Sequence, residues 1–196
     1  MLTLASANAD KARELAEILA GLALEVRPRP ATLADVDETG DTLLANARLK
    51  AAAVAGAVGG PAVADDTGLE VDALGGAPGV HTARFAGPDA DAAANVAKLL
   101  GALASTPAAG RRARFRTVVV LRWPDGQELS AEGVCEGSIT AAPRGEAGFG
   151  YDPVFAPDEG GGATFAEMPP AAKHAISHRG RALRALAEAL TRGADR

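Results

Sequence analysis

Two adjacent carboxylates, Asp65 and Asp66, follow a short apolar run in the segment Ala64-Asp65-Asp66-Thr67-Gly68. Neighbouring carboxylates repel each other unless a cation neutralises them, and Mg²⁺ prefers such oxygen ligands together with water and substrate phosphates. Glu38, in the acidic loop over residues 35–40, is a further candidate ligand. The alternatives are a polar turn at Asp65-Asp66, which is good turn chemistry, and a surface acid at Glu38.

Basic side chains stand at the expected N-termini of two helices. The segment Ser6-Ala7-Asn8-Ala9-Asp10-Lys11 leads into the first helix, where Asn8 can act as the N-cap. Lys173, His178 and Arg179 surround the start of the last helix. A cation opposes the helix dipole at this end unless an anion binds there. Both segments therefore suit phosphate binding; the alternatives are a solvated lysine and a basic corner on the surface.

Aromatic residues make up only 4% of the chain, yet Phe149 and Tyr151 alternate with glycines in Gly148-Phe149-Gly150-Tyr151-Asp152-Pro153. Glycine lets a backbone approach a ligand closely, so this loop is a candidate stacking platform for a base. The alternative is a turn whose aromatic side chains fill the core. Metal-binding carboxylates, phosphate-binding cations and a base platform together favour cleavage of a nucleotide phosphoanhydride.

The elements that must position these residues alternate along the chain between strands and helices. Strands are expected at residues 2–5, 24–27, 62–64, 114–121 and 129–135. Helices are expected around residues 12–19, from Asp41 or Thr42 to the break at residues 59–61, at 89–103 and around 183–190. The turn Pro124-Asp125-Gly126 predicts a β-hairpin. This order predicts an α/β fold with a mixed sheet. We further expect two lobes with a cleft between them.

Composition restricts the class of protein. The 196 residues suffice for a single two-lobed domain over residues 1–196, and the net charge of −5 with no basic run disfavours a nucleic-acid backbone as partner. Cys135 is the only cysteine, which excludes an intrachain disulfide and a cysteine metal site. No signal peptide and no membrane-spanning apolar run are visible. We therefore expect a soluble cytoplasmic protein.

The chain resembles the inosine/xanthosine triphosphate pyrophosphatases over nearly its whole length, from Leu4 to Leu190. The matching segments are Ser6–Lys11, Glu38-Thr39-Gly40 with Asn46-Ala47 and Lys50-Ala51, Asp65–Gly79, Phe149–Pro153 and Lys173 with Ser177-His178-Arg179-Gly180. The resemblance implies an elongated mixed β-sheet flanked by helices, two lobes with an active-site cleft between them, and a homodimer. It also implies Mg²⁺-dependent hydrolysis of ITP, dITP and XTP to the monophosphate and pyrophosphate, which clears them from the nucleotide pool.

The resemblance also assigns roles to single residues. Asp66 would be the proton acceptor and a metal ligand, with Glu38 and Asp65 as further ligands, and Phe149 would stack on the base. The implied substrate contacts are Ser6, Ala7, Asn8, Ala9, Asp10, Lys11, Lys50, Thr67, Phe149, Gly150, Tyr151, Asp152, Lys173, His178 and Arg179.

Some positions depart from the commonest pattern of the family. Thr67 replaces serine, His81 and Phe85 replace tyrosines, and His174 replaces asparagine. None of these changes removes a group with an assigned role, but they leave the fine substrate preference open. The alternatives are a pyrophosphatase for other modified nucleotides, a Mg²⁺-dependent phosphomonoesterase and a non-catalytic nucleotide-binding module.

Overall fold

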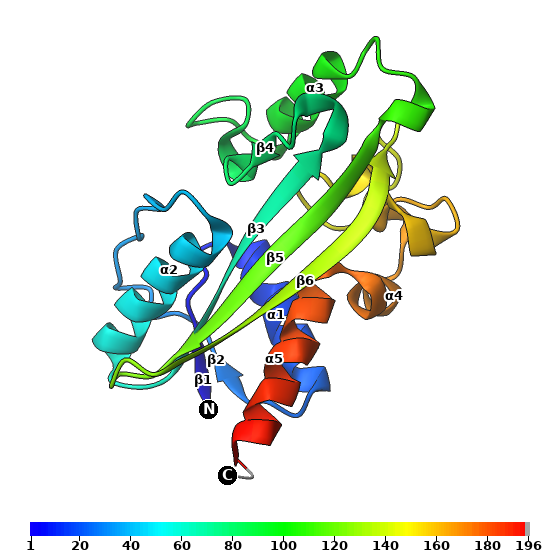
Figure 1. Cartoon of the computed structure of the whole chain (residues 1–196). Helices are drawn as coiled ribbons and strands as arrows, with labels where there is room; N and C mark the ends of the chain where they lie inside the picture. Colours follow the sequence, from blue (N-terminus) through cyan, green and yellow to red (C-terminus); the bar gives the residue numbers. More distant parts are fainter. Residues whose placement is uncertain (195–196) are drawn as a thin grey trace. The chain divides into compact units, whose positions relative to one another are not determined.

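A seven-stranded mixed sheet organises the fold in the computed structural model, which describes residues 1–194 (Figure 1). The strand order is β2-β1-β3-β5-β6-β7, and β4 pairs with β3. The strands are β1 (Leu2–Leu4), β2 (Val26–Arg27), β3 (Ala62–Val71), β4 (Pro78–Gly79), β5 (Arg112–Arg122), β6 (Glu128–Ile139) and β7 (Phe155–Pro157). Strand β1 is parallel to β2 and β3, whereas the β3–β4 and β6–β7 pairs are antiparallel. The expected α/β fold with a mixed sheet is confirmed.

Five α-helices accompany the sheet within residues 1–194. They are α1 (Ala9–Gly21), α2 (Leu43–Val58), α3 (Ala92–Ala102), α4 (Pro170–Ile176) and α5 (His178–Ala194). The predicted N-cap Asn8 accepts a hydrogen bond from the backbone N–H of Lys11. Of the two residues at which the second helix was expected to start, Asp41 and Thr42, the structure selects Thr42 as the cap, and its side chain accepts a hydrogen bond from the backbone N–H of Ala45. None of these helices has the combination of length and low polarity that a bilayer crossing requires.

The chain forms two compact units. The first contains Met1–Asp66, Thr117–Gly133 and the chain from His178 onward, and the second contains Thr67–Arg116 and Val134–Ser177. The division falls within three strands, because β3, β5 and β6 each begin in one unit and end in the other.

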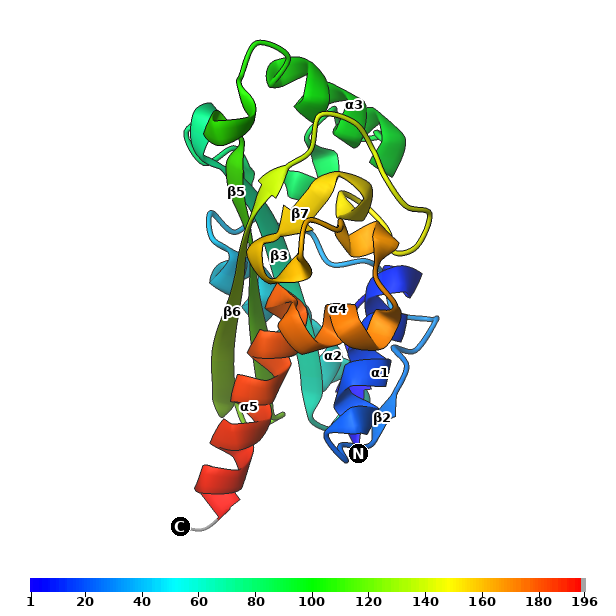
Figure 2. The same ribbon diagram turned by 90° about the vertical axis from the view of Figure 1, so that its right-hand side faces the viewer.

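The core of the first unit lies between its strands and the helices α1 and α5. Those two helices cover one face of the strands and α2 covers the other (Figures 1 and 2). Val119 and Leu121 of β5 pack in one cluster with Leu15 and Leu183, while the alternating Val118 and Val120 are buried as well. A strand covered on both faces reads as a continuous apolar run, which explains the sequence of this part of β5.

The core of the second unit is built around three aromatic rings. The centroids of Phe115 and Phe155 lie 4.7 Å apart, and those of Phe155 and Phe165 lie 5.3 Å apart. Leu99 and Leu103, within the range 89–103 expected to be helical, join the same cluster. Each unit thus has a hydrophobic core of its own.

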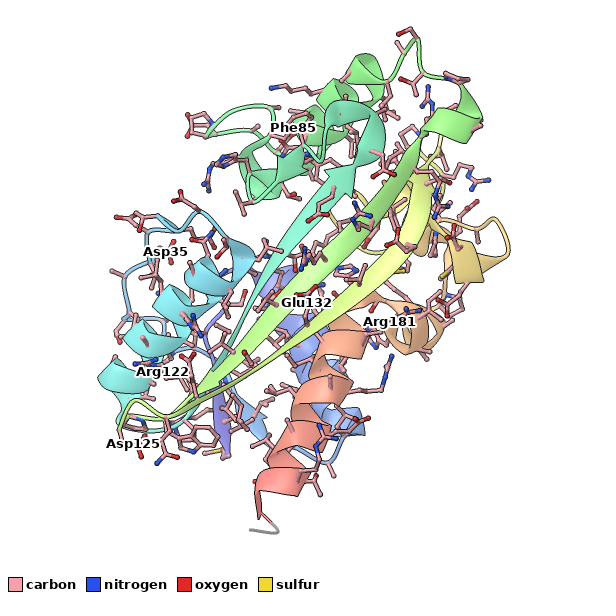
Figure 3. The ribbon with its side chains drawn as sticks, viewed as in Figure 1. Asp35, Phe85, Arg122, Asp125, Glu132 and Arg181 are labelled. Carbon is pink, nitrogen blue, oxygen red and sulfur yellow. The ribbon has the colours of Figure 1, made fainter. Side chains whose placement is uncertain are left out.

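The structure corrects one element that bears on the site. Strand β3 continues to Val71, beyond the expected end at residue 64, so Asp65 and Asp66 lie inside a strand, and the alternative of a polar turn here is wrong. The other turn is confirmed. Figure 3 shows Asp125 at the tip of the β5–β6 hairpin, where its carboxylate accepts a hydrogen bond of 2.9 Å from the backbone N–H of Gln127.

Candidate functional site

Asp65 and Asp66 are buried neighbours in β3, with 2% and 4% of their surfaces exposed. Successive side chains of a strand point to opposite faces of the sheet. The two carboxylates accordingly meet different partners within the first unit: Asp66 bonds to residues of α2, and Asp65 bonds to a residue of α5. The strand can contain both charges because each face supplies its own cation.

On the α2 face, Asp66 and Glu38 share the ammonium group of Lys50. Lys50 Nζ lies 2.8 Å from Glu38 Oε1 and 3.1 Å from Asp66 Oδ1. Burial raises the pKa of Asp66, and the charges of Lys50 and Lys11 offset this only in part, so that the pKa stays above its ordinary value. A raised pKa suits a carboxylate that must accept a proton near neutral pH.

The opposite face carries a buried network of one cation and two anions. Arg179 directs Nε and Nη2 to Asp65 Oδ2, both at 3.2 Å, and Nη1 to Glu14 of α1. Burial alone would raise the pKa of Asp65, but the charges of Lys11, Arg179 and Lys50 together hold it well below its usual range. Asp65 therefore stays ionised, and Arg179 ties β3 to α1 and α5.

The segment before α1 presents an N-terminal helix end with polar groups. Ala7, Asn8 and Ala9 are exposed, and Ser6 Oγ lies 3.3 Å from the carbonyl oxygen of Asn8. Lys11 follows in the first helical turn, and its charge acts on both Asp65 and Asp66. Backbone N–H groups, the helix dipole and an ammonium group together favour an anion at this end of α1.

The donor set on the α2 face suits Mg²⁺. Within residues 1–194, no three histidine, cysteine or acidic side chains are grouped as a metal site. Mg²⁺, however, is commonly bound by one or two carboxylates, with water and substrate phosphates completing its shell. Glu38 and Asp66 supply two such carboxylates around one cation, Lys50. Asp65 meets Arg179 of α5, and its role as a metal ligand stays a prediction.

In the second unit, Asp152 organises the aromatic loop. Its Oδ2 accepts hydrogen bonds from the backbone N–H of Phe149 at 2.8 Å and from Lys173 Nζ at 2.7 Å. Lys173 Nζ also lies 5.0 Å from the centre of the Phe149 ring. Gly148 has φ +74°, and a Cβ there would overlap the Asp152 carboxylate, so glycine is required at this turn. The loop thus presents a half-buried ring beside a cation.

Tyr151 lies apart from that ring in the core of the second unit. It is 4% exposed, its hydroxyl donates to the carbonyl oxygen of Thr82 at 3.0 Å, and burial raises its pKa. Of the two alternatives for this loop, core filling therefore describes Tyr151, whereas Phe149 retains partial exposure. Tyr151 as a substrate contact stays a prediction.

The basic residues near the last helix are buried and do not form a surface corner. Lys173, His178 and Arg179 are 6%, 3% and 2% exposed. Lys173 lies in the second unit, whereas His178 and Arg179 open α5 in the first. The first unit therefore contains Glu38, Lys50 and Asp66 on the α2 face of β3 and Arg179 on the opposite face.

Sequence reasoning gave no role to two buried polar residues, Glu14 and Asn46. Glu14 lies on the buried side of α1 with Leu15 and Ile18, and Asn46 lies one helical turn before Lys50 on α2. The available signal was an acid and an amide on helix faces that are otherwise buried, because such groups need hydrogen-bonding partners.

The sequence and the fold both match proteins of one known family. The model of the Ham1 family matches residues 2–189. A dITP/XTP pyrophosphatase of Xanthomonas campestris is 53% identical over 188 residues, covering 94% of this chain and 94% of that protein. The dITP/XTP pyrophosphatase of Rhodospirillum centenum is 49% identical over 190 residues, covering 94% of this chain and 92% of that protein. The solved structure of a HAM1 protein from Coxiella burnetii aligns with a TM-score of 0.85 at 42% identity, covering 98% of this chain and 100% of that one.

Proposed function

We propose a function for this chain, which belongs to the Ham1 family: it hydrolyses the purine nucleoside triphosphates ITP, dITP and XTP to the monophosphate and pyrophosphate. The observation that carries this proposal is the cluster of Lys11, Glu38, Lys50 and Asp66 in the first unit, where a carboxylate of raised pKa lies among cations. Hydrolysis of a phosphoanhydride needs a proton acceptor and positive charge around the phosphates.

The reaction is an in-line attack of water on the α-phosphorus with pyrophosphate as the leaving group. Asp66 accepts the proton of the attacking water, and Lys11 and the N–H groups at the start of α1 bind the triphosphate. Lys50 lies between Glu38 and Asp66 and keeps the two carboxylates together. Glu38 and Asp66 would hold Mg²⁺, which when bound would neutralise charge on the phosphate oxygens.

The base is recognised by the second unit. Phe149 stacks on the purine, and Asp152 fixes the backbone N–H of Phe149 and the ammonium group of Lys173 beside the ring. A donor that meets the oxygen at C6 of hypoxanthine or xanthine would be left unpaired opposite the amino group of adenine, which disfavours ATP. Comparable kcat/KM values for ITP and GTP would contradict the proposal that the enzyme clears aberrant nucleotides. They would not contradict the proposal that it is a nucleoside triphosphate pyrophosphatase.

A nucleotide panel with Mg²⁺ tests the reaction, with pyrophosphate, orthophosphate and nucleotide products identified separately. Pyrophosphate from ITP, dITP and XTP is the expected result. Release of orthophosphate would identify a phosphomonoesterase. Release of pyrophosphate from other modified nucleotides, but not from ITP, dITP and XTP, would identify a pyrophosphatase with a different substrate class. Nucleotide binding without turnover would identify a nucleotide-binding module.

Asp66→Asn tests the proton acceptor. We expect the variant to keep its fold and to lose activity by about 10²–10⁴-fold, the usual contribution of a general base. Asp125→Asn is the matched control, because Asp125 lies in the hairpin turn and the asparagine oxygen can still accept from Gln127. A rate above about a tenth of wild type in Asp66→Asn would exclude Asp66 as the base.

We also propose that the protein is a cytoplasmic homodimer, as the resemblance to the pyrophosphatases implies. Sedimentation equilibrium should then give the mass of two chains of 19.7 kDa each, and a single-chain mass would contradict the dimer.

A further inference from the structure

The carboxamide of Asn46 connects Asp66 with the loop that carries Glu38. Asn46 is fully buried, its Nδ2 donates to Asp66 Oδ2 at 3.2 Å, and its Oδ1 accepts from the backbone N–H of Gly40 at 2.8 Å. The amide supplies both the donor and the acceptor that these contacts need, whereas aspartate would place a second anion against Asp66. The type of residue at position 46 therefore follows from its two partners.

The two oxygens of Asp66 have separate partners from the same helix face. Oδ1 faces the ammonium group of Lys50, and Oδ2 faces the amide of Asn46. Asn46 and Lys50 are four residues apart on α2 and so lie on the same side of the helix. With one contact to each oxygen, α2 defines the rotation of the carboxylate group as well as its position.

Gly40 completes the connection from the other side. A Cβ at this position would lie 2.6 Å from Cβ of Ala45 and 2.7 Å from Asn46 Oδ1, so the loop approaches α2 too closely for any side chain. Figure 3 shows the loop that carries Asp35 leading into the N-terminal end of α2. The chain from Glu38 to Gly40 is thus held at both ends, by Lys50 and by Asn46.

We propose that Asn46 is a positioning residue that fixes the orientation of the Asp66 carboxylate and its spacing from Glu38. Lys50 alone could hold the two acids together, but a bound metal would compete for the carboxylate oxygens and a bound phosphate would compete for the ammonium group of Lys50. The amide of Asn46 is neutral, so it can keep Asp66 and the Gly40 backbone in place while cations exchange. This inference rests on the proposed function, because it assigns Asn46 to the same site.

Two substitutions of Asn46 distinguish its contact with Asp66 from its contact with Gly40. Asn46→Asp keeps an oxygen for the Gly40 N–H but replaces the donor to Asp66 with a second anion, whereas Asn46→Leu removes both contacts at similar volume and adds no charge. Asn95 of α3 provides the matched control, because its buried amide joins the N–H of Ala86 at 2.7 Å to the carbonyl oxygen of Ala83 at 3.0 Å in the second unit. Asn95→Asp and Asn95→Leu repeat the same chemistry outside the site.

The measurements are kcat and KM for ITP, the Mg²⁺ concentration at half-maximal rate, and the dissociation constant of Mn²⁺ for the nucleotide-free protein by electron paramagnetic resonance. Residues that orient metal ligands typically contribute about 10- to 100-fold to metal affinity or activity. We expect Asn46→Leu to weaken Mn²⁺ binding and to lower kcat by such a factor, with a smaller change in KM. Asn46→Asp should lower kcat similarly. The Asn95 variants should change only the thermal midpoint.

The outcomes are distinguishable. If the Asn46 variants lose only thermal stability, with kcat and both metal constants within about twofold of wild type, the residue is merely structural and the inference fails. If either Asn46 variant does not fold, Gly40→Ala disturbs the other end of the same connection and should weaken Mn²⁺ binding. If the wild type hydrolyses no nucleotide, the proposed function fails, and the Mn²⁺ constants of the variants still decide the role of Asn46.

Discussion

At the scale of single residues, Asp65 and Asp66 are chemically identical but have opposite electrostatic environments. Burial raises the pKa of Asp66, whereas the charges of Lys11 and Arg179 overcome burial and lower the pKa of Asp65. Environments that separate the pKa values of two carboxylates are a common way to divide chemical roles. Asp66 is thus suited to take up a proton, and Asp65 to remain a fixed anion that anchors Arg179.

Arg179→Met tests this anchoring role. The substitution leaves Asp65 and Glu14 buried without their shared cation, and breaking such a pair typically costs about 3–5 kcal/mol. We expect a loss of this size in the free energy of unfolding measured with urea at neutral pH. Arg181→Met, on the same helix and labelled in Figure 3, is the control and should cost less than about 1 kcal/mol. Equal losses in the two variants would contradict the buried network.

At the scale of elements, the start of α5 is defined by its contact with β6. A Cβ at Gly133 would overlap the carbonyl oxygen of His178 and lie 2.5 Å from the backbone N of Ala182. Because both obstacles are backbone atoms, no side-chain rotation can relieve the overlap. Gly133 thereby sets how closely the first turn of α5, which carries Arg179, approaches the strand.

Gly133→Ala should therefore destabilise the protein, although alanine is intrinsically more favourable than glycine inside a strand. Overpacking of this kind typically costs about 1–3 kcal/mol, which urea unfolding can measure. Gly56 of α2 has no atom within 4 Å of its hypothetical Cβ, so Gly56→Ala should instead stabilise the protein by about 0.5–1 kcal/mol. A Gly133→Ala variant as stable as wild type would show that α5 is not restricted by this contact.

At the scale of the whole molecule, the candidate groups divide between the two units. The acid–lysine cluster and Arg179 belong to the first unit, and the aromatic loop with Asp152 and Lys173 belongs to the second. Each cluster is held by contacts inside its own unit. Chemistry and base recognition are therefore expected to respond separately to substitution.

Phe149→Ala tests this division. Stacking on an aromatic side chain contributes about 1–3 kcal/mol per base, so we expect KM for ITP to rise by about 5- to 150-fold while kcat changes less. Phe85, whose ring centre lies 4.6 Å from Lys98 Nζ, is a matched phenylalanine–lysine pair, and Phe85→Ala should leave both constants near wild type. A fall in kcat with unchanged KM in Phe149→Ala would assign the ring to the chemical step.

Sequence patterns were sufficient to predict the fold class and most of the elements around the site. Period-3.6 and apolar patterns located the helices and strands, and local chemistry placed the caps at Asn8 and Thr42 and the turn at residues 124–126. These features depend on residues within a few positions of one another, which a pattern records directly. The two lobes around a cleft depend on no such local pattern and stay a prediction.

The different environments of Asp65 and Asp66 depend on tertiary contacts. A pair of aspartates reads locally as a turn, yet β3 continues through it because Arg179, distant in sequence, neutralises one side chain while Lys50 and Asn46 hold the other. Strand alternation then sends the two carboxylates to opposite faces. Buried charges are tolerated only where non-local partners meet them, so no local pattern could have separated the roles of Asp65 and Asp66.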